Sequence, residues 1–435
     1  MSPQGAPSVL IVTTLDYETL PNGFEHHRAA HYAALGCSVS VLYKRLRRER
    51  GLVAFLRDTF CPRVRADADG PIRLVALDPP FNYHPGLRTG AEEAADPARP
   101  PSLRLRLARL LSPLGLAREL AFVPWALLGF ALKVRARQDV CLGVGAFGGL
   151  AGWLLRALGR ADVLVYADRD YEPGLFPDGL RRRAAAAAER FCIRRADVLV
   201  SVGELLAELR RAETGRRAEI LPNGVDWERF AAARASRRRA GARLVYVGNV
   251  AGWSGLELAV AALPELARRH PDVRLTVVGD GLPGAMARLR DAAARLGVSE
   301  RLELLGRRPP SELCGLLAEA DVGLASSPPV PFRRFAAPLK VVEYMAAGLP
   351  VVATEGTEAG ATVTRARAGL AVPYEAGALR AALERLLADA PLRAELGARG
   401  AEHSRGLDWR ALVARELDLA LAARARRRPA AAEGV

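Results

Sequence analysis

The stretch PLKVVEYMAAGLPVVAT, residues 338–354, joins a short helix to a strand through a tight turn. Pro338 suits the first helical position, because its missing N–H would have no partner there. Gly348 provides a C-terminal stop, and Pro350 prevents the helix from continuing. Residues 351–353 form an apolar run short enough for a buried parallel strand. The stretch therefore predicts helix, turn and strand, the repeating unit of an α/β protein.

The beginning of this predicted helix carries charges that suit a nucleotide. The free N–H groups of a helix start attract anions, and Lys340 adds a full positive charge in the same turn. Glu343 follows Lys340 by three residues and Leu339 by four, so the three side chains share one face. A carboxylate there can accept hydrogen bonds from the two hydroxyls of a ribose. The pattern indicates a nucleoside diphosphate; alternatively, Glu343 only offsets the helix dipole and Lys340 is solvated.

Length and charge limit the possible classes of protein. At 435 residues the chain is too long for one ordinary core, so we expect two domains. The formal net charge of +15 favours an anionic partner such as phosphate or acidic lipid. Because no aromatic–basic interleaving or recognised module accompanies this charge, no nucleic-acid partner is expected.

Cysteine usage and the N-terminus indicate a cytoplasmic protein. The five cysteines are scattered and form no CxxC pair, so neither a disulfide framework nor a zinc site is expected: Cys37, Cys61, Cys141, Cys192 and Cys314. The start MSPQGAPSVLIVTT lacks the charged and apolar regions of a signal peptide, and its VLIV is better interpreted as a buried strand.

Short β-rich runs alternate with Ala/Leu/Arg-rich helical segments along the chain. The predicted strands are 9–12, 39–43, 163–166, 198–202, 244–247, 275–278, 302–304, 322–324 and 351–353. Strands separated by helices imply parallel, doubly wound sheets, which bind ligands at the carboxyl ends of their strands. A polar run around 230–242 separates the two sets. We therefore predict two Rossmann-like domains, 1–232 and 240–405, that face each other across a cleft.

Three segments depart from this alternation. Residues 80–101 are rich in Pro, Gly and charge and are interpreted as a mobile loop. Residues 102–137 are studded with arginine and then become apolar, which favours contact with an anionic membrane surface. The alternative for that segment is a pair of core helices, and both interpretations are compatible. Residues 425–435 are expected to be a disordered tail.

The order of several motifs resembles the GT-B glycosyltransferases, in particular the family-4-like group that uses nucleotide-diphosphate sugars. The matching segments are PNGFEHHRAAHYAALGCSVSVLY (21–43), ILPNGVDWERF (220–230), LVYVGNVAGWSGLELAVAAL (244–263), LTVVGDG (275–281) and PLKVVEYMAAGLPVVAT (338–354). The resemblance covers nearly the whole chain, including a final helix of about 408–424 expected to pack back on the first domain. It implies a donor site in the second domain, an acceptor site in the first, and no essential metal.

This resemblance assigns expected roles to residues of the donor site. Contacts to the diphosphate are expected from Gly23, Pro338, Leu339, Lys340 and Asn249. The ribose is expected at Glu343, and the base near Gly306 and Arg307. Many relatives carry an Arg and a Lys where this chain has Asn249 and Ser254, and a glutamate where it has Phe335. The missing charge is expected from Lys340, Arg333, Arg334 or Arg307.

The acceptor side is expected at two places in the first domain. Glu25 and His26 open a helix and are candidates for contact with the acceptor or the sugar, although such residues are also common on surfaces. Asp170, with Asp168 as orienter, is the candidate base or acceptor contact, because both follow a buried strand and alternate on an extended segment. Alternatively, the two aspartates cap a helix and pair with Arg169 or Arg181. Glu189 is interpreted as structural, paired with Arg194.

The leading hypothesis is a glycosyltransferase that moves a sugar from a nucleotide diphosphate to a lipid-linked or surface-glycan acceptor at the cytoplasmic membrane face. Two alternatives remain. Asn249 and Ser254 are compatible with a catalytically weakened relative that binds sugar nucleotides or acts as a scaffold. GT-B nucleotide-sugar epimerases share the fold and need no acceptor.

Overall fold

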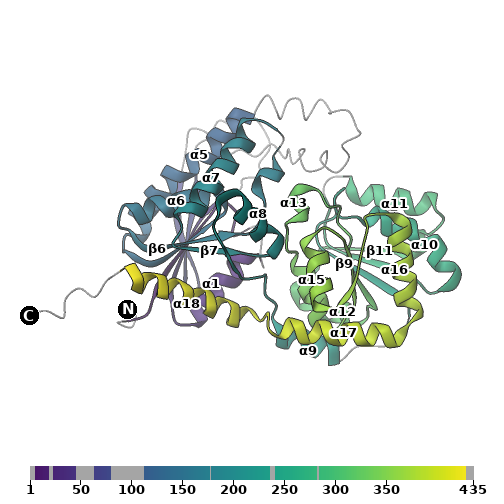
Figure 1. Ribbon diagram of the computed structural model, residues 1–435. Coiled ribbons are helices and arrows are strands. Elements are labelled where there is room, and N and C mark those ends of the chain that lie inside the picture. The colour runs from purple at the N-terminus through teal and green to yellow at the C-terminus, as the bar shows by residue number, and fades with distance from the viewer. Residues whose placement is uncertain are drawn as a thin grey trace, which may run out of the picture. The chain divides into compact units, whose positions relative to one another are not determined.

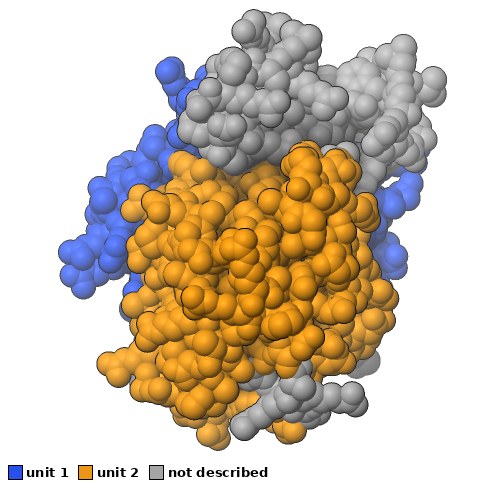
Figure 2. All heavy atoms as spheres, turned by 90° about the vertical axis from the view of Figure 1, so that its right-hand side faces the viewer, with its two compact units in different colours: residues 1–93, 98–222, 409–435 blue, residues 94–97, 223–408 orange. Residues whose placement is uncertain are grey.

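The computed structural model describes residues 5–18, 23–45, 63–79, 112–176, 178–235, 241–281 and 284–427. They form two compact units, coloured differently in Figure 2. Unit 1 holds the described residues up to 222 and those from 409 onward, and unit 2 holds residues 223–408. The predicted boundary at 232 falls inside helix α9 (Trp227–Ala235), which belongs to unit 2.

Unit 1 is built on an eight-stranded sheet with the order β3-β4-β2-β1-β5-β6-β7-β8. Its strands are β1 (Ser8–Thr13), β2 (Ser38–Lys44), β3 (Arg63–Asp69), β4 (Ile72–Asp78), β5 (Gln138–Val144), β6 (Ala161–Asp168), β7 (Val198–Ser201) and β8 (Glu219–Ile220). Only the edge strand β3 runs antiparallel to its neighbour. β6 is buried along its whole length, because helices cover both faces of the sheet.

The described helices of unit 1 are α1 (Phe24–Ala34), α5 (Ser112–Gly129), α6 (Gly145–Ala157), α7 (Leu180–Arg195), α8 (Glu204–Thr214) and α18 (Trp409–Arg427). Two short helical turns are η1 (Phe130–Val134) and η2 (Glu172–Leu175). Figure 1 shows α5, α6 and α7 over one face of the sheet, and α1 with α18 over the other. The C-terminal helix therefore belongs to the unit that begins the chain.

Unit 2 is built on a six-stranded, fully parallel sheet with the order β11-β10-β9-β12-β13-β14. Its strands are β9 (Arg243–Val247), β10 (Arg274–Val278), β11 (Leu302–Gly306), β12 (Val322–Ala325), β13 (Val351–Thr354) and β14 (Gly369–Val372). Besides α9, its helices are α10 (Leu256–Arg269), α11 (Ala285–Arg295), α12 (Pro310–Ala318), α13 (Pro331–Arg334), α14 (Leu339–Ala346), α15 (Glu358–Ala366), α16 (Ala376–Ala388) and α17 (Ala390–Arg405), with a short turn η3 (Ser299–Arg301).

Two apolar cores lie on opposite faces of the unit 2 sheet. Side chains of α10, α11 and α16 pack on one face, and side chains of α14 and α15 pack on the other. Alternate residues of one strand supply both cores: Leu244 enters the first and Val245 the second. This burial on both faces explains why the strands appear in the sequence as short apolar runs.

The stretch 338–354 folds as helix, turn and strand. Pro338 is the residue that precedes the helix, rather than its first residue, and α14 begins at Leu339. Gly348 has a φ of +74°, a left-handed conformation that a glycine adopts without steric cost. All four residues of β13 are buried. Local capping and turn chemistry thus predicted this element, with an offset of one residue at its start.

The predicted class, α/β with two doubly wound Rossmann-like domains, is confirmed. All nine predicted strands are present, and the sequence analysis missed β3, β4, β5, β8 and β14. β3 is mostly exposed and polar, so it carries no apolar run that would have marked it. The predicted loop 80–101 lies outside the described residues, as do residues 428–435 of the predicted tail; residues 425–427 are the end of α18.

Helix α5 and η1 form the apolar segment, which the sequence analysis interpreted either as core helices or as a membrane-contacting segment; they have one buried and one exposed apolar face. Phe122, Ala126 and Phe130 are buried in the core of unit 1, whereas Leu120, Leu128 and Leu132 are exposed. Among the described residues, Gly115–Val134 is the one helical stretch long and apolar enough to cross a membrane, a test that core helices of soluble proteins also pass. Residues 102–111 of the predicted membrane-contacting segment lie outside the described part of the chain.

Candidate functional site

In unit 2, the order of the strands creates a switch point next to β9. The chain runs outward from β9 to β10 and β11, and then returns to the other side of β9 as β12. In such sheets, ligands bind outside the carboxyl ends of the strands at this point. Here the loop after β9 meets the first turn of α14: a methyl group added to Gly248 would lie 3.0 Å from Lys340 Nζ.

Lys340 is a half-buried cation at this place. Its Nζ lies 3.6 Å from the centroid of the Tyr246 ring, a cation–π contact. None of the described residues offers it a hydrogen-bond acceptor or an ion-pair partner. Burial lowers the pKa of Lys340 well below its usual range, and the charge of Arg333 lowers it further, while Glu343 acts in the opposite direction. An anion at this position would supply the missing partner.

Glu343 lies one turn further along α14, on the face of Lys340. Burial raises the pKa of its carboxyl group to about 7, although the positive charges of Arg229 and Lys340 oppose the shift. Arg229 belongs to α9, the helix that packs beside α14. A carboxyl group with this pKa changes its charge near neutral pH, so its hydrogen-bonding role depends on pH.

Two glycines allow the loops at this switch point to approach closely. Gly255 has a φ of +72°, and a methyl group there would overlap the carbonyl oxygen of Ser326. Gly279 has a φ of +142°, and a methyl group there would overlap the carbonyl oxygen of Gly248. The three loops after β9, β10 and β12 therefore converge as backbone, with N–H groups and no intervening side chains.

Asn249 and Ser254, where the family resemblance implies cations, carry no charge. Asn249 is exposed, and its carbonyl oxygen accepts a hydrogen bond of 2.9 Å from the Tyr246 hydroxyl. Ser254 is fully buried and donates from its hydroxyl to the carbonyl oxygen of Ala251 at 2.7 Å. Ser254 thus stabilises the turn of the loop.

The residues expected near the base lie farther along the sheet. Gly306 ends β11 with a φ of +67°, and the Arg307 backbone N–H donates to Asp280 Oδ1 at 3.2 Å. The Arg307 side chain is exposed. Both residues are at the carboxyl end of a strand, two strands away from β9.

In unit 1, the beginning of α1 places Glu25 and His26 differently. Glu25 is 4% exposed; its Oε1 accepts from the Thr13 hydroxyl at 3.2 Å and from Arg169 at 2.6 Å. His26 is half-buried and stacks on the Tyr17 ring, with 3.6 Å between the centroids. Its Nδ1 is buried without a hydrogen-bond partner, and burial lowers the pKa of the imidazole. His26 thus has a ring nitrogen with hydrogen-bonding capacity left, whereas the Oε1 of Glu25 is already bonded to two partners. Gly23 caps α1 in an extended conformation, with a φ of −73°.

Asp168 lies inside an ion cluster rather than at a surface. It is 1% exposed, and the Arg210 guanidinium donates to both of its oxygens, at 2.9 and 3.0 Å. Arg210 also contacts Glu189 at 2.8 Å, so the predicted pairing of Glu189 with Arg194 is wrong. Asp170 is half-buried beyond the end of β6, and its charge raises the pKa of Asp168 after the larger effect of burial. Asp168 thus holds the segment on which Asp170 is placed.

The sequence analysis missed Glu172. Its Oε2 accepts from the backbone N–H of Ala146 at 3.2 Å, at the beginning of α6. Gly145 has a φ of +68°, and a methyl group there would overlap the carboxylate. Burial raises the pKa of Glu172 to about 7. No local pattern joins residues 145 and 172, because the contact arises from two adjacent strand ends of the sheet.

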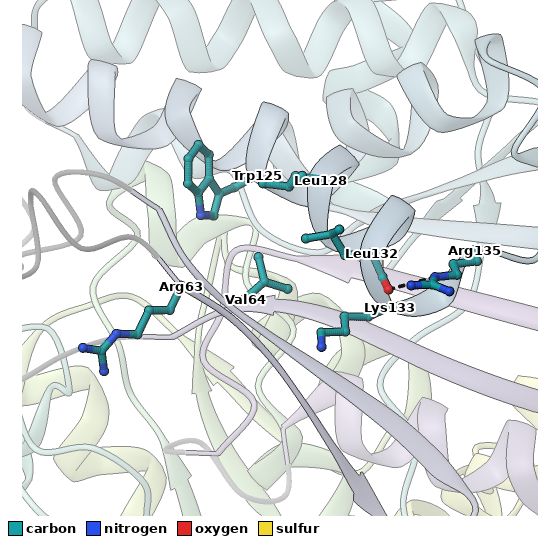
Figure 3. Close-up of a pocket in the computed structure, with 7 residues that line it drawn as sticks. All are labelled: Arg63, Val64, Trp125, Leu128, Leu132, Lys133 and Arg135. Carbon is teal, nitrogen blue, oxygen red and sulfur yellow. Dashed lines mark hydrogen bonds between the residues drawn. The ribbon is translucent and has the colours of Figure 1, made fainter.

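A groove lies between α5, η1 and the edge strand β3 of unit 1 (Figure 3). It measures about 350 Å³ and is lined by Arg63, Val64, Trp125, Leu128, Leu132, Lys133 and Arg135. Apolar side chains form its middle, and the cations lie around them. The Arg135 Nε donates to the Leu132 carbonyl oxygen at 3.1 Å. This apolar and positively charged lining is complementary to an amphiphile with a negative charge.

Within the described ranges, no group of three His, Cys, Asp or Glu side chains is arranged to hold a metal ion. Of the five cysteines, Cys37, Cys141, Cys192 and Cys314 have free thiols, and Cys61 lies outside the described residues.

Comparisons with known proteins identify the family. A model of the glycosyl transferase 4-like domain matches residues 26–224, and a model of the glycosyl transferases group 1 matches residues 241–389. Both units are thereby covered. The chain belongs to the group 1, 4-like family of glycosyltransferases, which has the GT-B fold, as the motifs had indicated.

Individual relatives are distant. Glycogen synthase of Mycobacterium tuberculosis is 30% identical over 253 residues, which are 57% of this chain and 59% of that protein. The D-inositol 3-phosphate glycosyltransferase of Corynebacterium glutamicum is 29% identical over 329 residues, 70% of this chain and 77% of that protein. The structure of Anabaena HepE in complex with UDP matches with a TM-score of 0.65 at 17% identity, over 95% of this chain and 100% of that chain.

Proposed function

We propose that the protein transfers a sugar from a nucleoside diphosphate sugar to an acceptor, with the donor bound in unit 2. The observation that carries this proposal is the ammonium group of Lys340 at the switch point of the sheet, which has no hydrogen-bond acceptor among the described residues. A half-buried cation without an acceptor is unfavourable by itself, and the diphosphate of a donor offsets this cost. The UDP named in the HepE structure is a ligand of this class.

The roles of the surrounding residues follow from their positions. Lys340 and the start of α14, with Pro338 and Leu339, hold the diphosphate near the backbone of Asn249. Glu343 accepts hydrogen bonds from the ribose hydroxyls. Gly306 and Arg307 are proposed to meet the base. Stabilising the leaving diphosphate by such cations is the main catalytic need of this reaction.

Unit 1 is proposed to bind the acceptor. His26 and Asp170 are the candidates for contact with its hydroxyl groups, and Gly23 is proposed to let the backbone approach the phosphates. The groove of Figure 3 favours an acceptor attached to a lipid, or a surface-glycan precursor, presented at the cytoplasmic face of a membrane.

The first experiment is a thermal-shift panel of UDP, GDP, ADP and TDP with their common sugars. A ligand at about 100 times its dissociation constant stabilises a protein by roughly 2.7 kcal/mol, which is easily measured. We expect a shift with the nucleotides of one base, lost in Lys340→Met and Glu343→Ala. Glu265→Ala, at an exposed residue of α10, is the matched control and should keep the shift.

Turnover then separates the remaining alternatives. Release of nucleoside diphosphate that depends on an added acceptor supports a transferase. Conversion of the donor sugar without an acceptor would indicate an epimerase, and binding without any turnover would indicate a scaffold. A wild-type protein that binds no nucleotide would contradict the proposed donor site.

A further inference from the structure

The short helix α13 is fixed against the loop that follows β9. Phe332 is 4% exposed and meets the Trp253 ring edge to face, at 5.6 Å between centroids and 86° between planes. The backbone N–H groups of Arg333 and Arg334 both donate to the Val330 carbonyl oxygen, at 2.8 and 2.7 Å. Aromatic packing and this turn therefore set where the two arginines lie.

The two neighbouring arginines have different surroundings. Arg333 is half-buried, and its Cζ lies 5.1 Å from the Phe332 ring centroid and 5.5 Å from that of Trp253. Arg334 is exposed, with its Cζ 5.5 Å from the Phe335 ring. Arg333 thus points into the aromatic cluster beside the loop after β9, whereas Arg334 reaches solvent.

Arg333 and Lys340 contact aromatic rings at the two ends of one loop. Burial raises the pKa of Tyr246, whose ring Lys340 covers, to about 12 and lowers the pKa of Lys340; the positive charge of Arg333 acts to lower both. Tyr246 and Trp253 stand on either side of the loop 248–252, so the two cations pack against residues that flank the same loop. Like charges repel each other, and an anion bound between these two cations would attract both.

The indole of Trp253 adds a hydrogen-bond donor. Trp253 is 5% exposed, and its buried Nε1 has no hydrogen-bond partner in the part of the chain that the structure describes. An indole N–H can only donate, so its missing partner is an acceptor such as a phosphate oxygen. A buried donor without an acceptor is unfavourable, and a bound acceptor would remove this cost.

We propose that Arg333, packed on Trp253 and Phe332, is the second cation of the diphosphate site, opposite Lys340. It replaces the charge that Asn249 and Ser254 do not provide. This inference rests on the proposed donor site. It assigns one contact with the diphosphate to a residue of α13, outside the loop after β9. A guanidinium group suits a diphosphate because its planar N–H groups bind two oxygens at once.

The test compares Arg333→Met with Arg334→Met, a matched pair of adjacent arginines on the same helix. For each variant, titration calorimetry measures the affinity for the nucleoside diphosphate selected by the thermal-shift panel and for the corresponding nucleoside. We expect Arg333→Met to weaken binding of the diphosphate by about tenfold to a hundredfold, and binding of the nucleoside to remain unchanged. Arg334→Met should bind both ligands like the wild type.

Two further variants distinguish a contact from a packing effect. Trp253→Phe keeps an aromatic ring and removes the N–H. It should weaken binding of the diphosphate by a smaller factor than Arg333→Met does, without changing binding of the nucleoside. Arg333→Lys keeps the charge and should retain part of the affinity. Equal diphosphate affinities of wild type and Arg333→Met would overturn the inference and leave the donor site intact. A wild type that binds neither ligand would instead refute the donor site itself.

Discussion

At the scale of single residues, Lys340 and Glu343 show how burial changes the chemistry of a charged group. The sequence placed both on one helix face, but their perturbed pKa values arise from the structure around them. Burial disfavours the charged form of each: it lowers the pKa of the amine and raises that of the acid. A bound diphosphate would favour the charged form of Lys340, and ribose hydroxyls would favour the charged form of Glu343.

Binding of the nucleoside should therefore depend on pH through Glu343. Its pKa of about 7 means that the ionised fraction grows from about one tenth at pH 6 to about nine tenths at pH 8. The ionised carboxylate is the better acceptor for ribose, so the affinity should rise by up to about tenfold over this range. The nucleoside is the right ligand here, because it lacks the phosphates that report on Lys340.

The control for this titration is Glu343→Gln, which should bind the nucleoside weakly and without pH dependence. The same group affects stability in the opposite sense. Because its pKa is raised in the folded state, its stabilising contribution is complete below its usual pKa of 4.5 and is lost as pH rises through about 7. A wild-type affinity that is flat between pH 6 and 8 would contradict the role of Glu343.

At the scale of elements, α18 illustrates a contact between the two ends of the chain. Arg28 of α1 donates from its Nε to both oxygens of Glu416, at 2.9 and 3.2 Å, and the Tyr32 hydroxyl adds a bond of 2.7 Å. His27 stacks on Trp409 with 4.7 Å between the centroids. Both charged side chains are almost completely buried, so each depends on the other for its charge.

Arg28→Met should therefore destabilise unit 1 by about 3–5 kcal/mol, because it leaves the Glu416 carboxylate buried without a cation. The matched control is Arg415→Met on α18, the helix that carries Glu416, because the pair of Arg415 with Glu219 is exposed and contributes less than about 1 kcal/mol. Urea unfolding measures both. If the double variant Arg28→Met with Glu416→Leu regains much of the loss, the cost belongs to the unpaired charge; equal effects of Arg28→Met and Arg415→Met would contradict this account.

At the scale of the whole molecule, the net charge of +15 and the groove of unit 1 together favour an anionic membrane. On such a surface, the exposed leucines Leu128 and Leu132 would enter the interface, and Arg63 and Lys133 would meet lipid phosphates. Each such cation contributes about 1 kcal/mol near an anionic surface. We propose that the groove rests on anionic phospholipid.

Sedimentation with vesicles tests this proposal. The wild type should bind vesicles that contain phosphatidylglycerol and release them at high salt, and it should bind phosphatidylcholine vesicles poorly. The double variant Arg63→Gln with Lys133→Gln should lose about 2 kcal/mol of binding free energy to anionic vesicles, which is roughly thirtyfold in affinity. Leu158→Ser, at an exposed leucine at the end of α6, is the control for Leu128→Ser with Leu132→Ser. Equal binding to both kinds of vesicle would count against the groove.

The parts of the fold that could be predicted are those that local chemistry determines. Capping by Pro338, the stop at Gly348 and the apolar run of β13 lie within 17 residues, and they suffice for helix, turn and strand. Nine strands were found because burial on both faces makes them continuously apolar. β3 was missed because an exposed edge strand has no such requirement.

The candidate site was only partly predictable, because its electrostatics depend on residues far apart in the sequence. Asp168 is occupied by Arg210, 42 residues away, and Glu172 reaches α6 across 26 residues. The sequence by itself determined the two-domain α/β class, the family motifs and the shared face of Lys340 and Glu343. Only the tertiary structure decided which charges are paired and which remain available, because burial and pairing are set by neighbours that folding brings together.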